Sequence, residues 1–180
     1  MTNCEEEIRS MWRGEGVYGE IFCAVTVSAA FYKNDMRHIL ETGLAYVPPG
    51  SQFARVVRQT MDWCASANNW HEPMRKVYET YARQYHWVHT FPNIAMVVIG
   101  LFFGGGDFAE ALHFTALCGL DANCTAGQAA ALMGVLLGAE KIPEKWKDPL
   151  QDKFEIYIRK FESLIISDIA KKTIKNNQNN

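Results

Sequence analysis

Apolar residues recur at helical spacing along most of the chain, and this pattern predicts a series of helices separated by short polar breaks. Asn34, Ser51 and Asp107 are each placed to cap the helix that follows, because a short polar side chain can accept a hydrogen bond from a free amide of the next turn. No internal repeat, domain linker or strand-like alternation stands out. The helices we expect cover roughly residues 4–12, 17–31, 35–44, 52–64, 72–85, 94–103, 108–118, 126–137 and 150–169.

The helix after residue 125 is the one around which we expect the fold to be organised. Asp121, Asn123 and Cys124 stand directly before the small-residue run Ala126–Leu137. Short polar side chains are typical of helix N-termini, and many small residues allow neighbouring backbones to approach closely. Gly138 can end the helix in a left-handed conformation. The sequence therefore predicts a central, buried helix here.

The polar residues at the start of that helix allow two interpretations. Asp121 and Asn123 are two residues apart, so with Cys124 they would place several polar side-chain groups in one small volume. Oxygen ligands at a helix N-terminus can hold a hard cation or contribute to an anion site. Alternatively, Asp121 or Asn123 only caps the helix, which is the commoner role of these residues and the one that spacing alone favours.

Composition and charge narrow the class of protein. The chain has 180 residues, of which 48% are apolar and 21% charged, with a formal net charge of −2. This balance predicts no electrostatic attraction to nucleic acid or to acidic membranes. The longest apolar run, Ile94–Phe103, is far shorter than the ~20 residues of a spanning helix. Glu5, Glu6 and Glu7 argue against a secretory leader.

The cysteines point to a reducing compartment. There are five of them, an odd number, and none forms a CxxC pair. A reduced, cytoplasmic protein is the expectation. The five are Cys4, Cys23, Cys64, Cys118 and Cys124.

Residues 119–146, GLDANCTAGQAAALMGVLLGAEKIPEKW, resemble the C-terminal signature of the ADP-ribosylglycohydrolase family, G-x-D-x-D-[TSC]-x-A followed by a small-residue helix and I-P-x-x-W. Residues 14–51 and 85–121 resemble earlier parts of that family in order, so the resemblance covers nearly all of 10–150. It implies an all-α, orthogonal multi-helix bundle, truncated on its N-terminal side. We expect residues 1–172 to form one partial domain and 173–180 a frayed polar tail.

The resemblance also implies a metal site. Family members bind two Mg2+ or Mn2+ ions and cleave ADP-ribose from modified side chains or related substrates, with ligands from an Asp-x-Asp-[TSC] set and from an N-terminal Thr-Asp-Asp motif. Here Asp121, Asn123 and Cys124 match the first set, but no Asp-Asp pair occurs anywhere. Asn123 replaces a carboxylate by an amide, and the Cys124 thiol is a soft ligand. We expect Mg2+ or Mn2+ binding to be weak or absent.

The run GEGVYG near the N-terminus is literally GxGxxG. It fails as a dinucleotide fingerprint because no strand pattern precedes it. The resemblance instead places Gly16, Tyr18 and Gly19 near the bound ligand. Met11 and Trp12 stand where the family has a Ser/Thr-His pair, which argues against ordinary catalysis.

His86 and His89 are three residues apart in a stretch with apolar and aromatic neighbours. On a helix two such histidines could share zinc, but no third ligand stands at a suitable spacing. We expect Trp87 to pack inward, and His86 or His89 to line the ligand cleft or bond a backbone carbonyl.

Three functions follow from these expectations, and no catalytic residue is assigned in any of them. The first is an ADP-ribosylglycohydrolase-like protein that is inactive as an isolated chain. The second is half of a split hydrolase, completed by a separate N-terminal half. The third is a non-enzymatic module that binds an ADP-ribose-like nucleotide or a protein. Because a partial domain would expose apolar helix faces, we also expect self-association or a partner.

Overall fold

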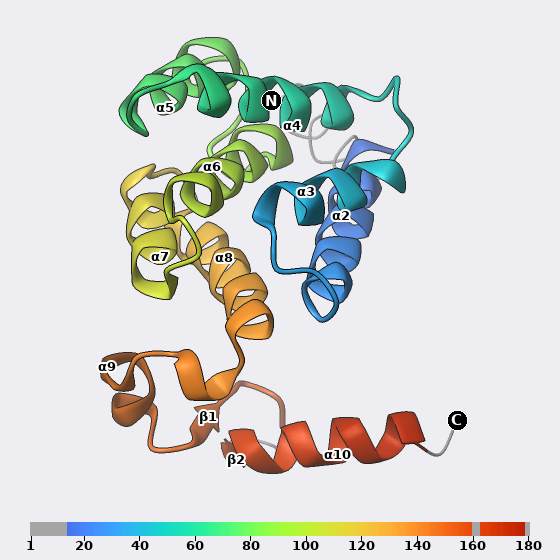
Figure 1. The fold of residues 1–180 in the computed structure, drawn as a ribbon, viewed down its shortest axis with the longest axis vertical. Helices are drawn as coiled ribbons and strands as arrows, with labels where there is room; N and C mark the ends of the chain where they lie inside the picture. Colours follow the sequence, from blue (N-terminus) through green and yellow to red (C-terminus); the bar gives the residue numbers. More distant parts are fainter. Residues whose placement is uncertain (1–13, 160–162, 179–180) are drawn as a thin grey trace. The chain divides into compact units, whose positions relative to one another are not determined.

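The computed structural model describes residues 14–159 and 163–178, so the expected helix over 4–12 and the Met11–Trp12 pair lie outside the described part. The chain divides into two compact units, Met1–Ala139 and Glu140–Asn180. The described residues are predominantly helical (Figure 1), which confirms the all-α prediction. Within the described ranges, no helix is both long and apolar enough to cross a lipid bilayer.

Unit 1 is built from α-helices joined by short turns. The α6 helix lies between α4 and α8 in Figure 1 and contacts both, as well as α7. The α2 helix contacts α3, α6 and α8. The elements are α2 Glu15–Ala30, α3 Met36–Ala45, α4 Gln52–Ser66, α5 His71–Val77, the π-helical turn η1 Tyr78–Ala82, α6 Thr90–Phe103, α7 Phe108–Leu117 and α8 Ala122–Leu137.

Four of these helices, α3, α4, α6 and α7, begin at a polar side chain that accepts a backbone N–H of the first turn, as capping chemistry requires. The predicted caps Ser51 and Asp107 are confirmed; the first accepts from Ala54 and the second from Glu110. The cap expected at Asn34 is wrong by one residue. Asp35 caps α3, because its carboxylate accepts the His38 N–H at 2.8 Å.

The core of unit 1 is centred on α6, where ten of fourteen residues are buried. Gly100 allows α7 to approach closely, since a Cβ there would lie 1.7 Å from the Thr115 hydroxyl oxygen. We expected α8 to be the central buried helix, and this was wrong. Its glycine at position 127 and its alanine at 131 are exposed, so the small residues do not all face neighbouring helices.

The helix expected over residues 72–85 is interrupted. The α5 helix ends at Val77 and continues as the π-helical turn η1, which ends at Ala82. The wider turn aims tyrosine hydroxyls at other elements. Tyr78 donates to the Cys118 carbonyl at 2.9 Å, and Tyr81 donates to the Gln59 side chain. The segment from Arg83 to His89 is then a loop rather than the end of a helix.

Unit 2 differs most from expectation, because the single helix predicted over 150–169 is not present. After α9, Glu144–Lys147, two short antiparallel strands, β1 Lys153–Glu155 and β2 Ser163–Ile165, pair with Phe154 opposite Leu164. Gln151 and Asp152 have φ values of 49° and 57°, which a right-handed helix excludes.

A second helix of unit 2, α10, begins after the hairpin and covers Ile166–Gln178. It therefore runs through most of the segment expected to be a polar tail. Its first turn is held by Asp152, whose carboxylate accepts the Ser167 N–H at 2.9 Å and the Ser167 hydroxyl at 2.7 Å.

Candidate functional site

A cavity of about 450 Å³ in unit 1, which we call the main cavity, lies where the N-terminal parts of α2, α6 and α8 meet. Its wall includes two thiols, Cys23 and Cys124, and two carboxylates, Glu20 and Asp121. Among the residues that the structure describes, no lysine, arginine or histidine contributes to this wall. The polar side chains on it are Glu20, Thr90, Asn93, Asp121, Thr125 and Gln128.

Four residues singled out from the sequence lie together on this wall, although they come from positions far apart in the chain. Gly16 and Gly19 belong to α2, and Asp121 and Cys124 to the start of α8. The packing of α2 against α8 brings the two sets to one cavity. Whether they bind a ligand or a metal stays a prediction.

Asn123 and Tyr18 do not contribute to the wall. Asn123 is exposed, and its amide donates to the Cys124 sulfur at 3.5 Å. Residues two apart at a helix start point in different directions, which separates Asn123 from Asp121.

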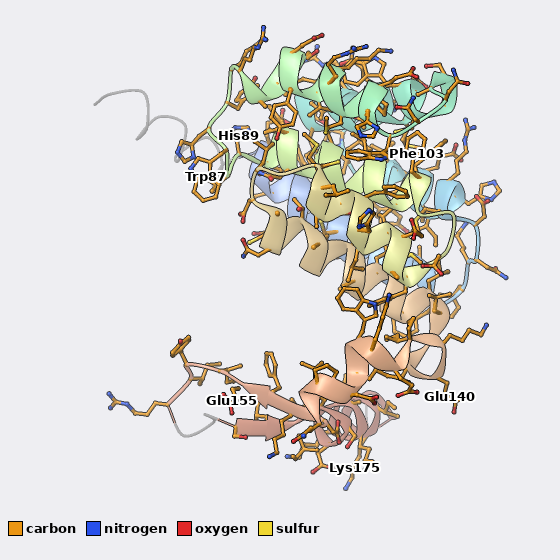
Figure 2. The ribbon with its side chains drawn as sticks, turned by 90° about the vertical axis from the view of Figure 1, so that its left-hand side faces the viewer. Trp87, His89, Phe103, Glu140, Glu155 and Lys175 are labelled. Carbon is orange, nitrogen blue, oxygen red and sulfur yellow. The ribbon has the colours of Figure 1, made fainter. Side chains whose placement is uncertain are left out.

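The histidines lie in the loop before α6. His89 is buried, and its Nδ1 accepts the Phe91 N–H at 3.2 Å, which caps α6. It also lines a smaller hollow of about 200 Å³ with Glu15 and Gln52. His86 is exposed. The expectation that Trp87 packs inward is wrong: its side chain is 54% exposed and projects outward, while His89 lies inward (Figure 2).

Asp121 precedes α8 at the capping position, but its side chain makes no capping hydrogen bond. The simple capping interpretation of Asp121 is therefore wrong. Its carboxylate is instead close enough to the Cys124 thiol to affect the pKa of that thiol. Hydrogen bonding to Asp121, together with slight burial and the negative charge of that carboxylate, raises the pKa of the Cys124 thiol, and the amide of Asn123 acts in the opposite direction.

Asn93 connects α6 to the start of α8, a role that the sequence analysis missed. Its side-chain oxygen accepts the Asp121 N–H at 3.2 Å. Its amide nitrogen donates to the carbonyls of Trp87, at 2.8 Å, and His89, at 2.9 Å. In the sequence, Asn93 follows Pro92, which is typical of a helix start, and nothing local indicates the distant contact.

Glu20 and Gln128 were also missed, although helical spacing could have found them. Glu20 lies four residues after Gly16 on α2, and Gln128 lies four residues after Cys124 on α8. Residues four apart on a helix share a face. Extending Gly16 and Cys124 by one helical turn therefore leads to the same wall.

The wall offers few ligands for a hard cation. Mg2+ prefers several oxygen ligands, usually with more than one carboxylate or phosphate around it. Glu20 and Asp121 are the carboxylates here, the Asn93 amide oxygen already accepts a backbone N–H, and thiols suit soft metals. In the described part of the chain, no three His, Cys, Asp or Glu side chains are grouped so that they could hold a metal ion. These residues do not fit a two-ion site by themselves.

Two helix N-termini border the cavity without a side-chain cap. Neither α2, which begins beside Gly16, nor α8, which begins after Asp121, has one. Free amides and the helix dipole favour anionic oxygens at such ends. The carboxylates of the cavity can therefore accept hydrogen bonds from hydroxyl groups of a ligand. The free backbone amides at the two helix N-termini can donate hydrogen bonds to phosphate oxygens.

The chain matches the model of one known protein family. No curated protein and no solved structure matches the chain. The family model of the ADP-ribosylglycohydrolases matches residues 11–179, which is most of the chain and includes all the residues of the cavity wall. The chain therefore belongs to the ADP-ribosylglycohydrolase family.

Proposed function

We propose that the main cavity binds an ADP-ribose-like ligand, and that these 180 residues do not hydrolyse it unless another polypeptide segment supplies further carboxylates. The observation that carries the proposal is the shared wall. The glycine-rich start of α2 and the Asp121 turn before α8 border one cavity of about 450 Å³, which is within the usual range for small-molecule sites.

The chemistry of the wall suits the two ends of such a ligand. Ribose hydroxyls can donate to the Asp121 and Glu20 carboxylates, and a hydrogen bond to a charged acceptor is stronger than a neutral one. Diphosphate oxygens can accept from the uncapped amides at the starts of α2 and α8. Because the described part of the chain places no cationic side chain on the wall, we expect the affinity to be modest.

The missing ligands support the second part of the proposal. In the family, divalent cations orient the ribose hydroxyls and activate water. Asp121 and Glu20 come from the N-terminal parts of different helices, α8 and α2, and no third carboxylate of residues 14–159 or 163–178 joins them on the wall. A neutral amide at Asn123, itself outside the wall, does not replace a carboxylate. We therefore propose that hydrolysis requires a complementary segment carrying acidic ligands.

Calorimetric titration with ADP-ribose tests the first part. Asp121→Ala should weaken binding by about tenfold or more, as expected for losing hydrogen bonds to a charged acceptor. Asp62→Ala is a matched control, because Asp62 is an exposed carboxylate on α4 that does not contribute to the cavity wall. If the wild-type protein shows no heat up to millimolar ADP-ribose, the binding proposal is wrong.

A turnover assay tests the second part. With Mg2+ or Mn2+ present, the purified chain should release no ADP-ribose from an ADP-ribosylated protein. Adding a family N-terminal segment that carries Thr-Asp-Asp should restore release if the acidic ligands are what is missing. Clear turnover by the chain alone would contradict the proposed requirement.

A further inference from the structure

The connection between α7 and α8, Cys118–Asp121, delivers Asp121 to the cavity wall through an unfavourable backbone conformation. Gly119 and Leu120 are consecutive residues with φ values of 76° and 59°. Glycine adopts the left-handed region readily, but a leucine rarely does. A turn with this conformation at Leu120 persists when the surrounding structure holds it.

The first end of the turn is held by Tyr78. Its hydroxyl donates to the Cys118 carbonyl at 2.9 Å, across forty positions of sequence. Burial, followed by the neighbouring Cys118, raises the pKa of Tyr78, so its hydroxyl keeps its proton at neutral pH. The fit is tight: a Cβ on Gly119 would lie 2.8 Å from the Tyr78 oxygen.

The second end is held by Asn93. Its side-chain oxygen accepts the Asp121 N–H at 3.2 Å, and its amide group is fixed by the Trp87 and His89 carbonyls. The orientation of the acceptor is therefore set before it meets Asp121. Residues from η1 and α6 thus bracket the turn at both of its ends.

We propose that Tyr78 and Asn93 are positioning residues, which hold the Asp121 carboxylate on the cavity wall against the conformational preference of Leu120. The consequence for ligand affinity rests on the proposed function, whereas the consequence for the turn does not. Tyr78 is the more informative of the two, because it does not contribute to the wall and acts only through the turn.

Tyr78→Phe is the decisive variant, since it removes one hydroxyl and keeps the ring. Tyr81→Phe is its matched control: Tyr81 belongs to the same π-helical turn, but its hydroxyl donates to Gln59 and not to the Cys118 turn. Two quantities are measured on the full chain, the hydrogen-exchange rate of the Asp121 amide and the Kd for ADP-ribose. Asn93→Ala, which removes the partner of the Asp121 amide, serves as the second test variant.

Tyr78→Phe should speed exchange of the Asp121 amide and weaken ADP-ribose binding by about two- to tenfold, the range that one net hydrogen bond allows. Asn93→Ala should increase the exchange rate at least as much. Tyr81→Phe should leave both quantities near their wild-type values, even where it lowers Tm.

Unchanged Asp121 exchange in Tyr78→Phe would overturn the proposal, as would equal changes in Tyr78→Phe and Tyr81→Phe. If the wild-type protein does not bind ADP-ribose, the proposed function fails separately. The exchange rate of the Asp121 amide then decides the positioning role by itself.

Discussion

The carboxylate of Glu15 accepts the backbone N–H of Phe53 at 2.6 Å, and its other oxygen accepts the Gln52 N–H at 3.0 Å. Ser51 satisfies a further amide of the same turn, that of Ala54. The first turn of α4 is therefore capped from two directions, by its own preceding residue and by the start of α2. A negative charge at a helix N-terminus is also favoured by the dipole.

Replacing Glu15 should loosen this connection between α2 and α4. Glu15→Ala should lower the free energy of unfolding by about 2 kcal/mol, because two partly buried amides lose a charged acceptor. Urea denaturation measures the change. Glu41→Ala is the control: Glu41 forms an exposed ion pair with Arg37, at 2.9 Å, which should contribute less than about 1 kcal/mol. Equal losses in the two variants would contradict the capping role.

Two glycines inside helices should respond to alanine in opposite directions. At Gly100 a Cβ would meet the Thr115 hydroxyl at 1.7 Å and its backbone nitrogen at 2.8 Å, so α6 and α7 must separate. We expect Gly100→Ala to destabilise the protein by about 3 kcal/mol. A Cβ on Gly127 meets nothing within 4 Å, and Gly127→Ala should stabilise α8 by about 0.5–1 kcal/mol. Thermal unfolding of both variants checks the difference in sign.

The Cys124 thiol should react slowly with alkylating reagents for an exposed cysteine. Its hydrogen bond to Asp121 raises its pKa above the ordinary value of 9.0, so the thiolate is scarce at pH 8. Asp121→Ala should lower the pKa of the Cys124 thiol and therefore speed its alkylation at any pH below the wild-type pKa. Mass spectrometry of peptides resolves each cysteine, and the buried thiols Cys64 and Cys118, with pKa values raised to about 12, should stay unmodified.

An unchanged rate at Cys124 in the Asp121→Ala protein would show that the thiol does not donate to this carboxylate in solution. Bound ADP-ribose should also slow the reaction in the wild-type protein, because Cys124 lies on the cavity wall. The alkylation rates at different pH values are compared in Tris-free buffers of constant ionic strength.

The start of α10 should weaken in acid. The hydrogen bonds from the Ser167 hydroxyl and N–H lower the pKa of Asp152 below its ordinary 3.8. Since the folded-state pKa is depressed, this contribution is complete above pH 3.8 and is lost as the pH falls through the folded value. Protection of the Ser167 amide, corrected for the intrinsic exchange rate, should show this loss.

Asp152→Ala should remove both the protection and its pH dependence. Asp168→Ala is the control, because Asp168 pairs with Lys171 on the exposed side of the helix at 3.6 Å and does not accept from Ser167. Protection of Ser167 that persists in Asp152→Ala would contradict the capping role of Asp152.

Much of unit 1 could be predicted because its helix boundaries are set by local chemistry. Ser51 and Asp107 cap the helices expected to follow them, and Gly138, with φ 78°, ends α8 as expected. These signals act over three or four residues, so a single sequence contains them.

The errors arose where contacts across loops and turns, rather than within one helical turn, decide the structure. The apolar spacing after residue 150 suits a helix. Positive φ values at Gln151 and Asp152 are incompatible with a right-handed helix there, and a strand pair forms instead. Trp87 was expected to pack in the core, but its side chain is exposed. Its backbone carbonyl accepts a hydrogen bond from the Asn93 amide. Hydrophobicity alone does not distinguish a helix from a strand pair, or a buried tryptophan from an exposed one.

The candidate site was predictable only in part for the same reason. The resemblance identified residues of two segments, Gly16 and Gly19 in one and Asp121 and Cys124 in the other, and the packing of α2 on α8 joins them. Asn93 and Tyr78 act on Asp121 and its turn through single hydrogen bonds across 28 and 40 positions. No spacing pattern in the sequence predicts hydrogen bonds between residues so far apart in the chain.

In the π-helical turn η1, the directions in which the side chains point depend on the number of residues in the turn. Such a turn contains one residue more than an α-helical turn, and each residue rotates an α-helix by about 100°. Deleting Glu79 or Thr80, which lie between Tyr78 and Tyr81, would therefore rotate these two tyrosines out of alignment with one another. The hydroxyl that reaches Cys118 and the hydroxyl that reaches Gln59 could then no longer both find their acceptors, so this stretch tolerates substitution far better than a change in length.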